Sequence, residues 1–254
     1  MARYQLTLAY DGTDFFGSQR QAKRRTVQGE LESALRKLRW TGHSILLSGR
    51  TDTGVHATGQ VAACDLDWAH TDEELVRALN SSLPNDMAVR NTKIIDDDFH
   101  PRFDARSRTY RYRIFFRPTR DPIRERYAWR IIQQKNIDLL KKAAKVFLGT
   151  HDFSAFGSPT TPKGPTVRTV MKSAWTQTAE DEWQYEVQAD AFLYRMVRRL
   201  VFVQVAAAQG KLHVDAILKA LKQTKSAKRS VFPSGLAPAH GLTLVHVEYQ
   251  ESKK

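Results

Sequence analysis

The residues best suited to chemistry lie in one stretch, Gly49-Arg50-Thr51-Asp52-Thr53-Gly54-Val55-His56. It places a single carboxylate, Asp52, beside an arginine in a turn bracketed by glycines. The chain has a formal net charge of +13 at pH 7, so a lone carboxylate is poorly suited to bind a polyanion. It is well suited to react with a polyanion that arginines have bound. The alternative is a turn-shaping role, because Asp often hydrogen-bonds its own backbone two residues on.

Basic residues gather in three further segments, which favours a nucleic acid or another polyanion as partner. The segments span residues 18–25, 102–113 and 219–229. The candidate contacts in the first two are Arg20, Arg24 and Arg108.

Alternation along Arg108-Thr109-Tyr110-Arg111-Tyr112-Arg113 predicts a strand with both tyrosines on one face and the arginines on the other. Two interpretations stay open. The tyrosines are core residues beneath a solvated charged face, or one ring stacks on a base while the arginines bind phosphates.

A helix is predicted from Phe192 to Ala208, and its apolar residues recur at helical spacing. The predicted core stripe comprises Leu193, Met196, Val197, Leu200 and Val201. Arg198 follows a core position directly, so it is expected at the helix edge. There it would pair with a buried carboxylate and keep that carboxylate ionised.

Composition narrows the class of protein. The 254 residues include 41% hydrophobic residues, enough for a sizeable core, and one cysteine, Cys64, which excludes an internal disulfide. No zinc-binding histidine spacing, phosphate-binding glycine loop, dinucleotide fingerprint or serine nucleophile elbow occurs. The expected site therefore needs no metal and no cofactor. With no apolar run of membrane-spanning length, a soluble cytoplasmic protein is expected.

Periodicity predicts two halves, residues 1–105 and 106–254. The first reads as strand 4–10, a helix capped by Thr26, strands 45–47 and 61–63, a helix opened by the Thr71–Glu74 capping box, and strand 89–95. This β-α-β-β-α-β order is ferredoxin-like. The second reads as strand 106–116, helix 138–148, strands 168–176 and 183–189, helices 192–208 and 214–221, and strand 242–249. The predicted class is α/β, with two ferredoxin-like halves forming one mixed, mainly antiparallel sheet around a central cleft.

Several motifs, in order along nearly the whole chain, resemble those of the tRNA pseudouridine synthase A family. They are Tyr10-Asp11-Gly12, Gln19-Arg20-Gln21, Gly49-Arg50-Thr51-Asp52, Gly54-Val55-His56-Ala57, Asp98-Phe99-His100-Pro101-Arg102-Phe103, Arg108-Thr109-Tyr110-Arg111-Tyr112, Phe192-Leu193-Tyr194-Arg195-Met196-Val197-Arg198 and His240-Gly241-Leu242. Two positions depart from the family pattern: Ser18 stands where Trp is usual, and Thr53 where Ala is usual.

The resemblance implies an isomerase of uridines in the anticodon stem-loop (positions 38–40 of the tRNA), acting without a cofactor. It implies Asp52 as nucleophile, Tyr110 as the ring stacked on the target uracil, and Arg198 as partner of the aspartate. It also implies that Arg50 fills the gap left by the flipped nucleotide. His56, Arg20, Arg24, Arg108 and Leu242 are the further expected substrate contacts. The implied assembly is a homodimer, with each tRNA spanning both subunits.

Three alternatives stay open. Asp52-Thr53-Gly54 is also the tripeptide of aspartic proteases, which need two such aspartates and here would require a symmetric dimer. A noncatalytic RNA-binding protein of paired ferredoxin-like sheets would need the arginines and not Asp52. A related enzyme would modify uridines of another RNA.

Overall fold

The computed structural model describes residues 1–133, 136–222 and 232–250. The chain divides into two compact units, Met1–Arg106 with Thr243–Lys254, and Ser107–Leu242. Of the basic residues predicted near the C-terminus, Lys225, Lys228 and Arg229 lie outside the described residues. Within the described ranges, no helix is long and apolar enough to cross a membrane.

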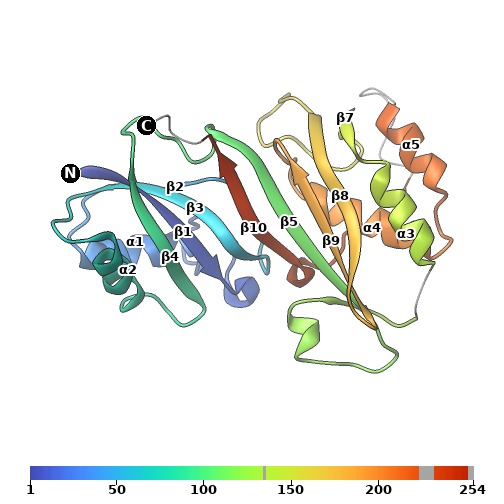
Figure 1. The fold of residues 1–254 in the computed structure, drawn as a ribbon, viewed down its shortest axis with the longest axis horizontal. Helices are drawn as coiled ribbons and strands as arrows, with labels where there is room; N and C mark the ends of the chain where they lie inside the picture. The colour runs from blue at the N-terminus through green and yellow to red at the C-terminus, as the bar shows by residue number, and fades with distance from the viewer. Residues whose placement is uncertain (134–135, 223–231, 251–254) are drawn as a thin grey trace. The chain divides into compact units, whose positions relative to one another are not determined.

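The first unit has the predicted β-α-β-β-α-β order (Figure 1). Its elements are β1 (Ala2–Tyr10), α1 (Val27–Lys37), β2 (Leu46–Leu47), β3 (His56–Leu66), α2 (Asp72–Asn80) and β4 (Met87–Ile95). Strand β1 lies between β3 and β4, and β2 pairs with β3, all antiparallel. This is the ferredoxin-like strand order, so the predicted class is confirmed for this unit.

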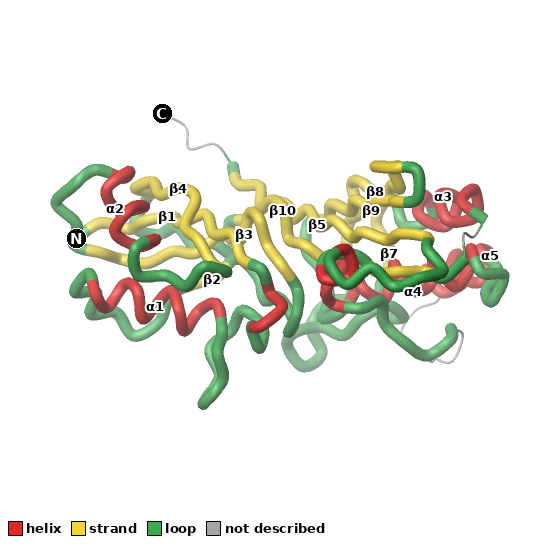
Figure 2. Tube along the Cα trace, turned by 90° about the horizontal axis from the view of Figure 1, so that it is seen from below, coloured by secondary structure: helices red, strands yellow, loops and turns green. Residues whose placement is uncertain are grey.

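Local sequence sets the helix starts of the first unit. The Thr26 hydroxyl accepts a hydrogen bond from Gly29 N at 3.2 Å, which caps α1. Thr71 and Glu74 form the predicted capping box at α2. Alternate β1 residues, Leu6 and Leu8 among them, are fully buried. Figure 2 shows α1 lying along one side of these strands.

The second unit begins with a similar order, β-α-β-β-α, once two short strands are set aside, and it ends in a second helix instead of a strand. Its elements are β5 (Ala105–Phe116), β6 (Trp129–Ile131), α3 (Ile137–Lys145), β7 (Gly149–Asp152), β8 (Val167–Ala179), β9 (Glu182–Ala189), α4 (Met196–Ala208) and α5 (Val214–Lys222). The strand order is β5-β9-β8-β7, antiparallel throughout, and β6 pairs with β5 in parallel. The mixed α/β class is confirmed here as well.

The structure differs from the sequence reading at α3, α4 and β10. Helix α3 ends at Lys145 rather than 148. Helix α4 begins at Met196 rather than Phe192, because Arg195 takes a left-handed backbone conformation with φ 61°. Strand β10 (Leu242–Tyr249) has its predicted bounds, but it pairs in parallel with β3 and groups with the first unit. Single 3-10 turns occupy Gly12–Asp14, Arg124–Arg126 and Ala239–Gly241.

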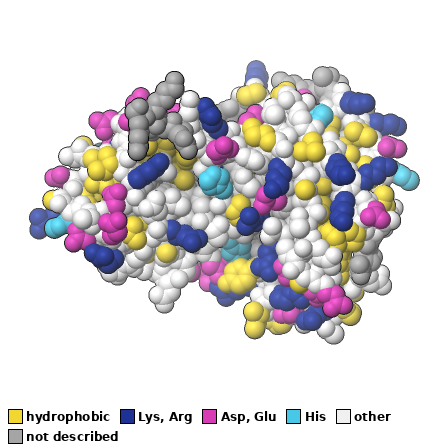
Figure 3. Space-filling model, viewed as in Figure 1, with side chains coloured by type: hydrophobic (Ala, Val, Ile, Leu, Met, Phe, Trp, Pro, Cys, Tyr) yellow, Lys and Arg dark blue, Asp and Glu magenta, His cyan; other side chains and the backbone are white. Residues whose placement is uncertain are grey.

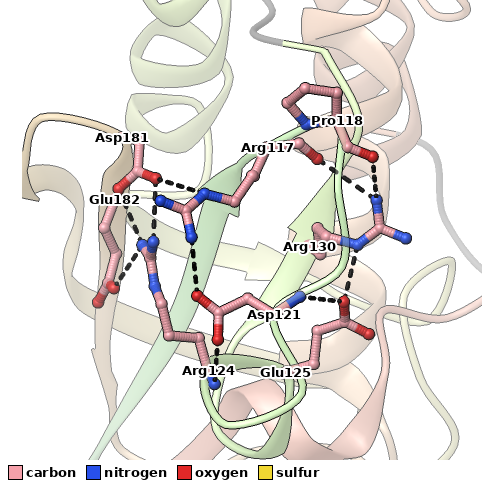
Figure 4. A network of polar contacts seen from close by, with 8 residues as sticks. All are labelled: Arg117, Pro118, Asp121, Arg124, Glu125, Arg130, Asp181 and Glu182. Atoms are coloured by element: carbon pink, nitrogen blue, oxygen red, sulfur yellow. Dashed lines mark hydrogen bonds and ion pairs between the residues drawn. The ribbon is translucent and has the colours of Figure 1, made fainter.

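An ion-pair network fastens the connection between β5 and β6 to the turn between β8 and β9 (Figure 4). At its centre, the Arg124 guanidinium donates to both oxygens of Asp181 at 2.9 Å and to Glu182 at 3.1 Å. The same guanidinium lies 4.2 Å from the Phe115 ring centroid. Arg117 donates to Asp121 at 3.0 Å, extending the network into the connection.

Replacing Arg124 should therefore destabilise the second unit. We expect Arg124→Met to lower the free energy of unfolding by about 1–2 kcal/mol, measured by urea denaturation, because two carboxylates lose a partly buried donor. The matched control is Arg120→Met, since the Arg120 side chain is 73% exposed. Equal effects of the two variants would contradict a special role for Arg124.

The same variant should change the pH dependence of stability. Arg124 lowers the pKa of Asp181 through hydrogen bonding. A carboxyl group with a lowered folded-state pKa stabilises the fold above its ordinary pKa, and that contribution is lost as pH falls. The stability difference between wild type and Arg124→Met should thus narrow below about pH 4.

Candidate functional site

Asp52 begins a tight turn whose geometry explains the residues that follow it. Val55 N donates to Asp52 O at 3.1 Å, and Gly54 has φ 78°. A positive φ at the third residue defines a type II turn and favours glycine there. Asp52 is half-buried at the start of this turn.

The segment from Gly12 to Ser18 braces this turn. Gly12 lies so close to the Val55 carbonyl that a side chain at residue 12 would collide with it. Gly17 has φ 84°, and Ser18 is fully buried. Ser18 N donates to Thr51 O at 3.1 Å, while the Ser18 hydroxyl accepts from Thr51 N at 2.8 Å. Both backbone polar groups of Thr51 are satisfied by this one residue.

A buried polar cluster holds the residues just before Asp52. The Tyr10 hydroxyl is hydrogen-bonded to the Thr51 hydroxyl at 2.9 Å. Gln60 donates to Gly49 O at 2.9 Å and accepts from the Ser48 hydroxyl at 2.6 Å. Burial raises the pKa of Tyr10 to about 12, so its hydroxyl stays protonated and available for this bond at neutral pH.

His56 has a local partner in the structure. Its ring Nδ1 accepts from Gly12 N at 3.0 Å, and the side chain is buried. The same nitrogen lies 3.1 Å from Asp11 Oδ1. A role of His56 in holding the Asp52 turn follows from these contacts, whereas its substrate contact stays a prediction.

The basic residues of the first unit differ in their surroundings. Arg20 donates to the fully buried Glu32 carboxylate at 2.6 Å and so compensates a buried charge. Arg24 is exposed, with its guanidinium 4.5 Å from the Phe16 ring centroid. Arg50, two positions before Asp52, is also exposed. Arg24 and Arg50 are therefore better placed than Arg20 to meet a solvent-borne polyanion.

Tyr110 is buried in the second unit and packs against the segment that leads into α4. Its ring centroid lies 5.1 Å from that of Phe192 at an interplanar angle of 87°, an edge-to-face contact. Arg108 donates to Asp190 O at 3.0 Å, which fastens the same segment to β5. Phe192 is thus a supporting residue that the sequence reading assigned only to a helix.

The arginines of β5 do not all share one face. Arg111 donates to Glu186 and Arg113 to Glu182, both at 2.7 Å. Arg108 lies two residues before Tyr110, so strand alternation gives it the tyrosine face. The prediction that placed Arg108 with the other arginines is wrong for this reason. Tyr112 is fully buried and donates to Pro238 O at 2.8 Å.

Arg198 is half-buried on α4 and holds the segment that precedes β10. Its Nε donates to Ala237 O at 2.8 Å, and Ala237 N donates to Arg198 O at 3.2 Å. Leu242, the other residue predicted here, is buried at the start of β10. The second unit therefore brings Arg198 next to the 237–238 backbone that also receives Tyr112.

The predicted site residues fall in both units. Asp52, Arg50, His56, Arg20 and Arg24 belong to the first, and Tyr110, Arg108, Arg198 and Leu242 to the second. The pairing of Arg198 with Asp52 stays a prediction. Sequence reading assigned no bracing role to Tyr10, Ser18 or Gln60. Gln60 directly precedes the apolar run Val61-Ala62-Ala63, which is the signal that could have found it. Among the described residues, no group of three His, Cys, Asp or Glu side chains is placed to hold a metal ion.

A family model and curated relatives agree on one family. A family model described as tRNA pseudouridine synthase matches residues 7–104 and 143–250. The tRNA pseudouridine synthase A of Chloroflexus aurantiacus is 41% identical over 98% of this chain and 89% of its own length. That of Bacillus subtilis is 39% identical over 97% of this chain and 99% of its own. The match to a chain of a solved Cbf5-Nop10-Gar1 complex covers 78% of this chain and 44% of that chain. The identity is 10% and the TM-score is 0.33.

The close approach of Gly12 to Val55 yields a stability prediction. Gly12→Ala should lower the free energy of unfolding by about 1–3 kcal/mol, because the new methyl group forces the Asp52 turn to shift. Gly49→Ala is the matched control, since a side chain there would meet nothing within 4 Å. Thermal and urea unfolding of both variants measure the difference. A stable Gly12→Ala protein would show that the two segments are not tightly packed.

Proposed function

This chain belongs to the tRNA pseudouridine synthase family, and we propose that it isomerises uridines of the anticodon stem-loop (positions 38–40 of the tRNA) to pseudouridine with Asp52 as nucleophile. The observation that supports this most is the Asp52 turn, in which buried hydrogen bonds hold a half-buried aspartate. Positioning a reactive group in this way is a large part of catalysis.

The reaction needs only groups of the kind this chain supplies. Pseudouridine forms when the N-glycosidic bond of uridine breaks, the uracil turns, and its C5 bonds to the same sugar carbon. The C5 proton is lost and N1 gains one, so nothing is oxidised and no phosphate is consumed. A carboxylate can attack the sugar C1′ or the base C6, or assist elimination. All three routes require one ionised aspartate, and none requires a cofactor.

The target uracil must leave its stack before Asp52 reaches it. Flipping costs a few kcal/mol, which stacking on Tyr110 and contacts from arginines offset. Arg50, exposed beside Asp52, is suited to fill the vacated space in the RNA. Arg198 is assigned to pair with Asp52 and keep it ionised. The proposed assembly is a homodimer, with each tRNA spanning both subunits.

The main alternative is a noncatalytic RNA-binding protein. Both functions would use the exposed arginines to bind RNA, so they differ in whether the Asp52 carboxylate is needed. We expect wild-type protein to release tritium from tRNA transcripts labelled at uracil C5, because the C5 proton is lost. Asp52→Asn should abolish release while keeping the affinity for tRNA within about threefold. The matched control is Asp67→Asn, because the Asp67 side chain is 93% exposed, and it should retain full release.

The outcomes separate the readings. Binding without release from the wild type would favour the RNA-binding protein or an enzyme for another RNA. Equal release from wild type and Asp52→Asn would remove Asp52 from the mechanism.

Affinity for tRNA should fall steeply with salt, because neutralising phosphates releases counterions. We expect Arg24→Gln to reduce the slope of log affinity against log salt concentration by about 0.7–0.9, the value of one phosphate contact. Arg3→Gln is the control, since Arg3 donates to both oxygens of Asp65 at 2.7 and 2.9 Å. A salt-independent affinity in filter-binding titrations would contradict phosphate contacts by these loops.

A further inference from the structure

The chain between β9 and α4 is held firmly at its beginning. The Asp190 carboxylate accepts from Thr169 N at 3.1 Å and from Ala191 N at 2.6 Å, while its backbone carbonyl accepts from Arg108. The next aromatic residue, Phe192, packs against Tyr110. Asp190 and Phe192 thus attach this segment to β5, the strand that carries the proposed uracil-stacking ring of Tyr110.

Tyr194 is exposed from this otherwise anchored segment. Its side chain is 48% exposed, whereas Leu193 before it is buried. Its backbone pairs with Ser158 in both directions, with Tyr194 N donating at 2.8 Å and Ser158 N at 3.4 Å. Gly157 allows this approach, because a Cβ there would meet Leu193 Cβ at 2.7 Å. The structure thus fixes the main chain of an aromatic residue that it leaves open to solvent.

Arg195 has an unfavourable backbone conformation, and its guanidinium lies over the Tyr194 ring. With φ 61° it is left-handed, which costs energy for a residue with a side chain. Its guanidinium lies 4.7 Å from the Tyr194 ring centroid, and the buried Met196 follows at once. Backbone strain of this kind concentrates at functional sites and persists where the surroundings enforce it.

We infer that Tyr194 and Arg195 form a second nucleotide-binding platform, where a base next to the target uridine stacks on the ring and Arg195 contacts its phosphate. An aromatic ring accepts any base, and an adjacent guanidinium adds attraction for the backbone. Only Leu193 stands between Tyr194 and Phe192, so the platform belongs to the segment that packs against Tyr110. This inference rests on the proposed function, because it takes the target nucleotide to lie at Tyr110.

The test uses the Asp52→Asn protein, which prevents turnover, and an anticodon stem-loop RNA with 2-aminopurine next to the target uridine. Stacking on Tyr194 should quench the 2-aminopurine fluorescence on binding. Tyr194→Ala should abolish that quenching and raise Kd roughly 5- to 150-fold, the range for losing one base–aromatic stack. Tyr194→Phe keeps the ring and should stay within about twofold of the parent.

The matched control is Tyr127→Ala. Tyr127 is 38% exposed with the Arg126 guanidinium 5.9 Å from its ring centroid, and it lies in the connection between β5 and β6. It should leave the quenching unchanged. An equal loss in Tyr127→Ala would mean a nonspecific aromatic effect and would overturn the platform.

Arg195→Gly separates binding from folding. Glycine adopts φ 61° without strain, so this variant should keep or raise Tm. It should nevertheless weaken RNA binding and reduce the slope of log affinity against log salt by about 0.7, one single-strand phosphate contact. An unchanged affinity and an unchanged salt slope in Arg195→Gly would overturn the phosphate contact assigned to Arg195.

Two readouts distinguish failure of the platform from failure of the proposed reaction. Tyr194-dependent quenching without tritium release by the wild type would support the platform and reject the isomerisation. Tritium release with an affinity insensitive to Tyr194→Ala would do the reverse. A change in oligomeric mass caused by Tyr194→Ala, with RNA binding per subunit intact, would assign Tyr194 to a contact between copies and overturn the platform.

Discussion

The first unit depends on fixing Thr51 without fully burying the next residue. A buried backbone group without a partner costs stability, so a loop can enter a core only where other groups satisfy its amides and carbonyls. Ser18 does this for Thr51 through both its backbone and its hydroxyl, and Tyr10 does it for the Thr51 side chain. The turn that begins at Asp52 is thereby held in place while Asp52 itself is only half-buried. Full burial would raise the free-energy cost of keeping its carboxylate charged.

In the second unit, charged arginine side chains satisfy backbone carbonyl groups in a comparable way. Arg198 and Arg199 donate to carbonyls of residues 233–237, and Tyr112 reaches Pro238. Many other arginines are neutralised by carboxylates, and Figure 3 shows basic and acidic side chains interspersed on one face. The net charge of +13 is therefore a poor guide to which arginines meet RNA. Exposure, as at Arg24 and Arg50, is a better one.

Sequence alone determined what depends on near neighbours. Caps at Thr26 and Thr71, alternation in β1 and β5, and the bounds of β10 follow from spacing of a few residues. It also located the Asp52 turn, because the Gly54 position needs a positive φ. It misjudged the start of α4, since helical periodicity continues through Phe192 while Arg195 breaks the helix.

Tertiary structure decided which polar residues are partners. Tyr10, Ser18 and Gln60 lie far apart along the chain, and only the folding of β1 and β3 around the 48–55 segment brings them to Thr51 and Gly49. Likewise, Arg20 forms an ion pair with Glu32. In β5, Arg111 pairs with Glu186 and Arg113 pairs with Glu182. Residue type and local spacing thus determined the elements and the reactive group. The bracing contacts needed the folded chain, because hydrogen bonds join atoms by distance in space and not by separation in sequence.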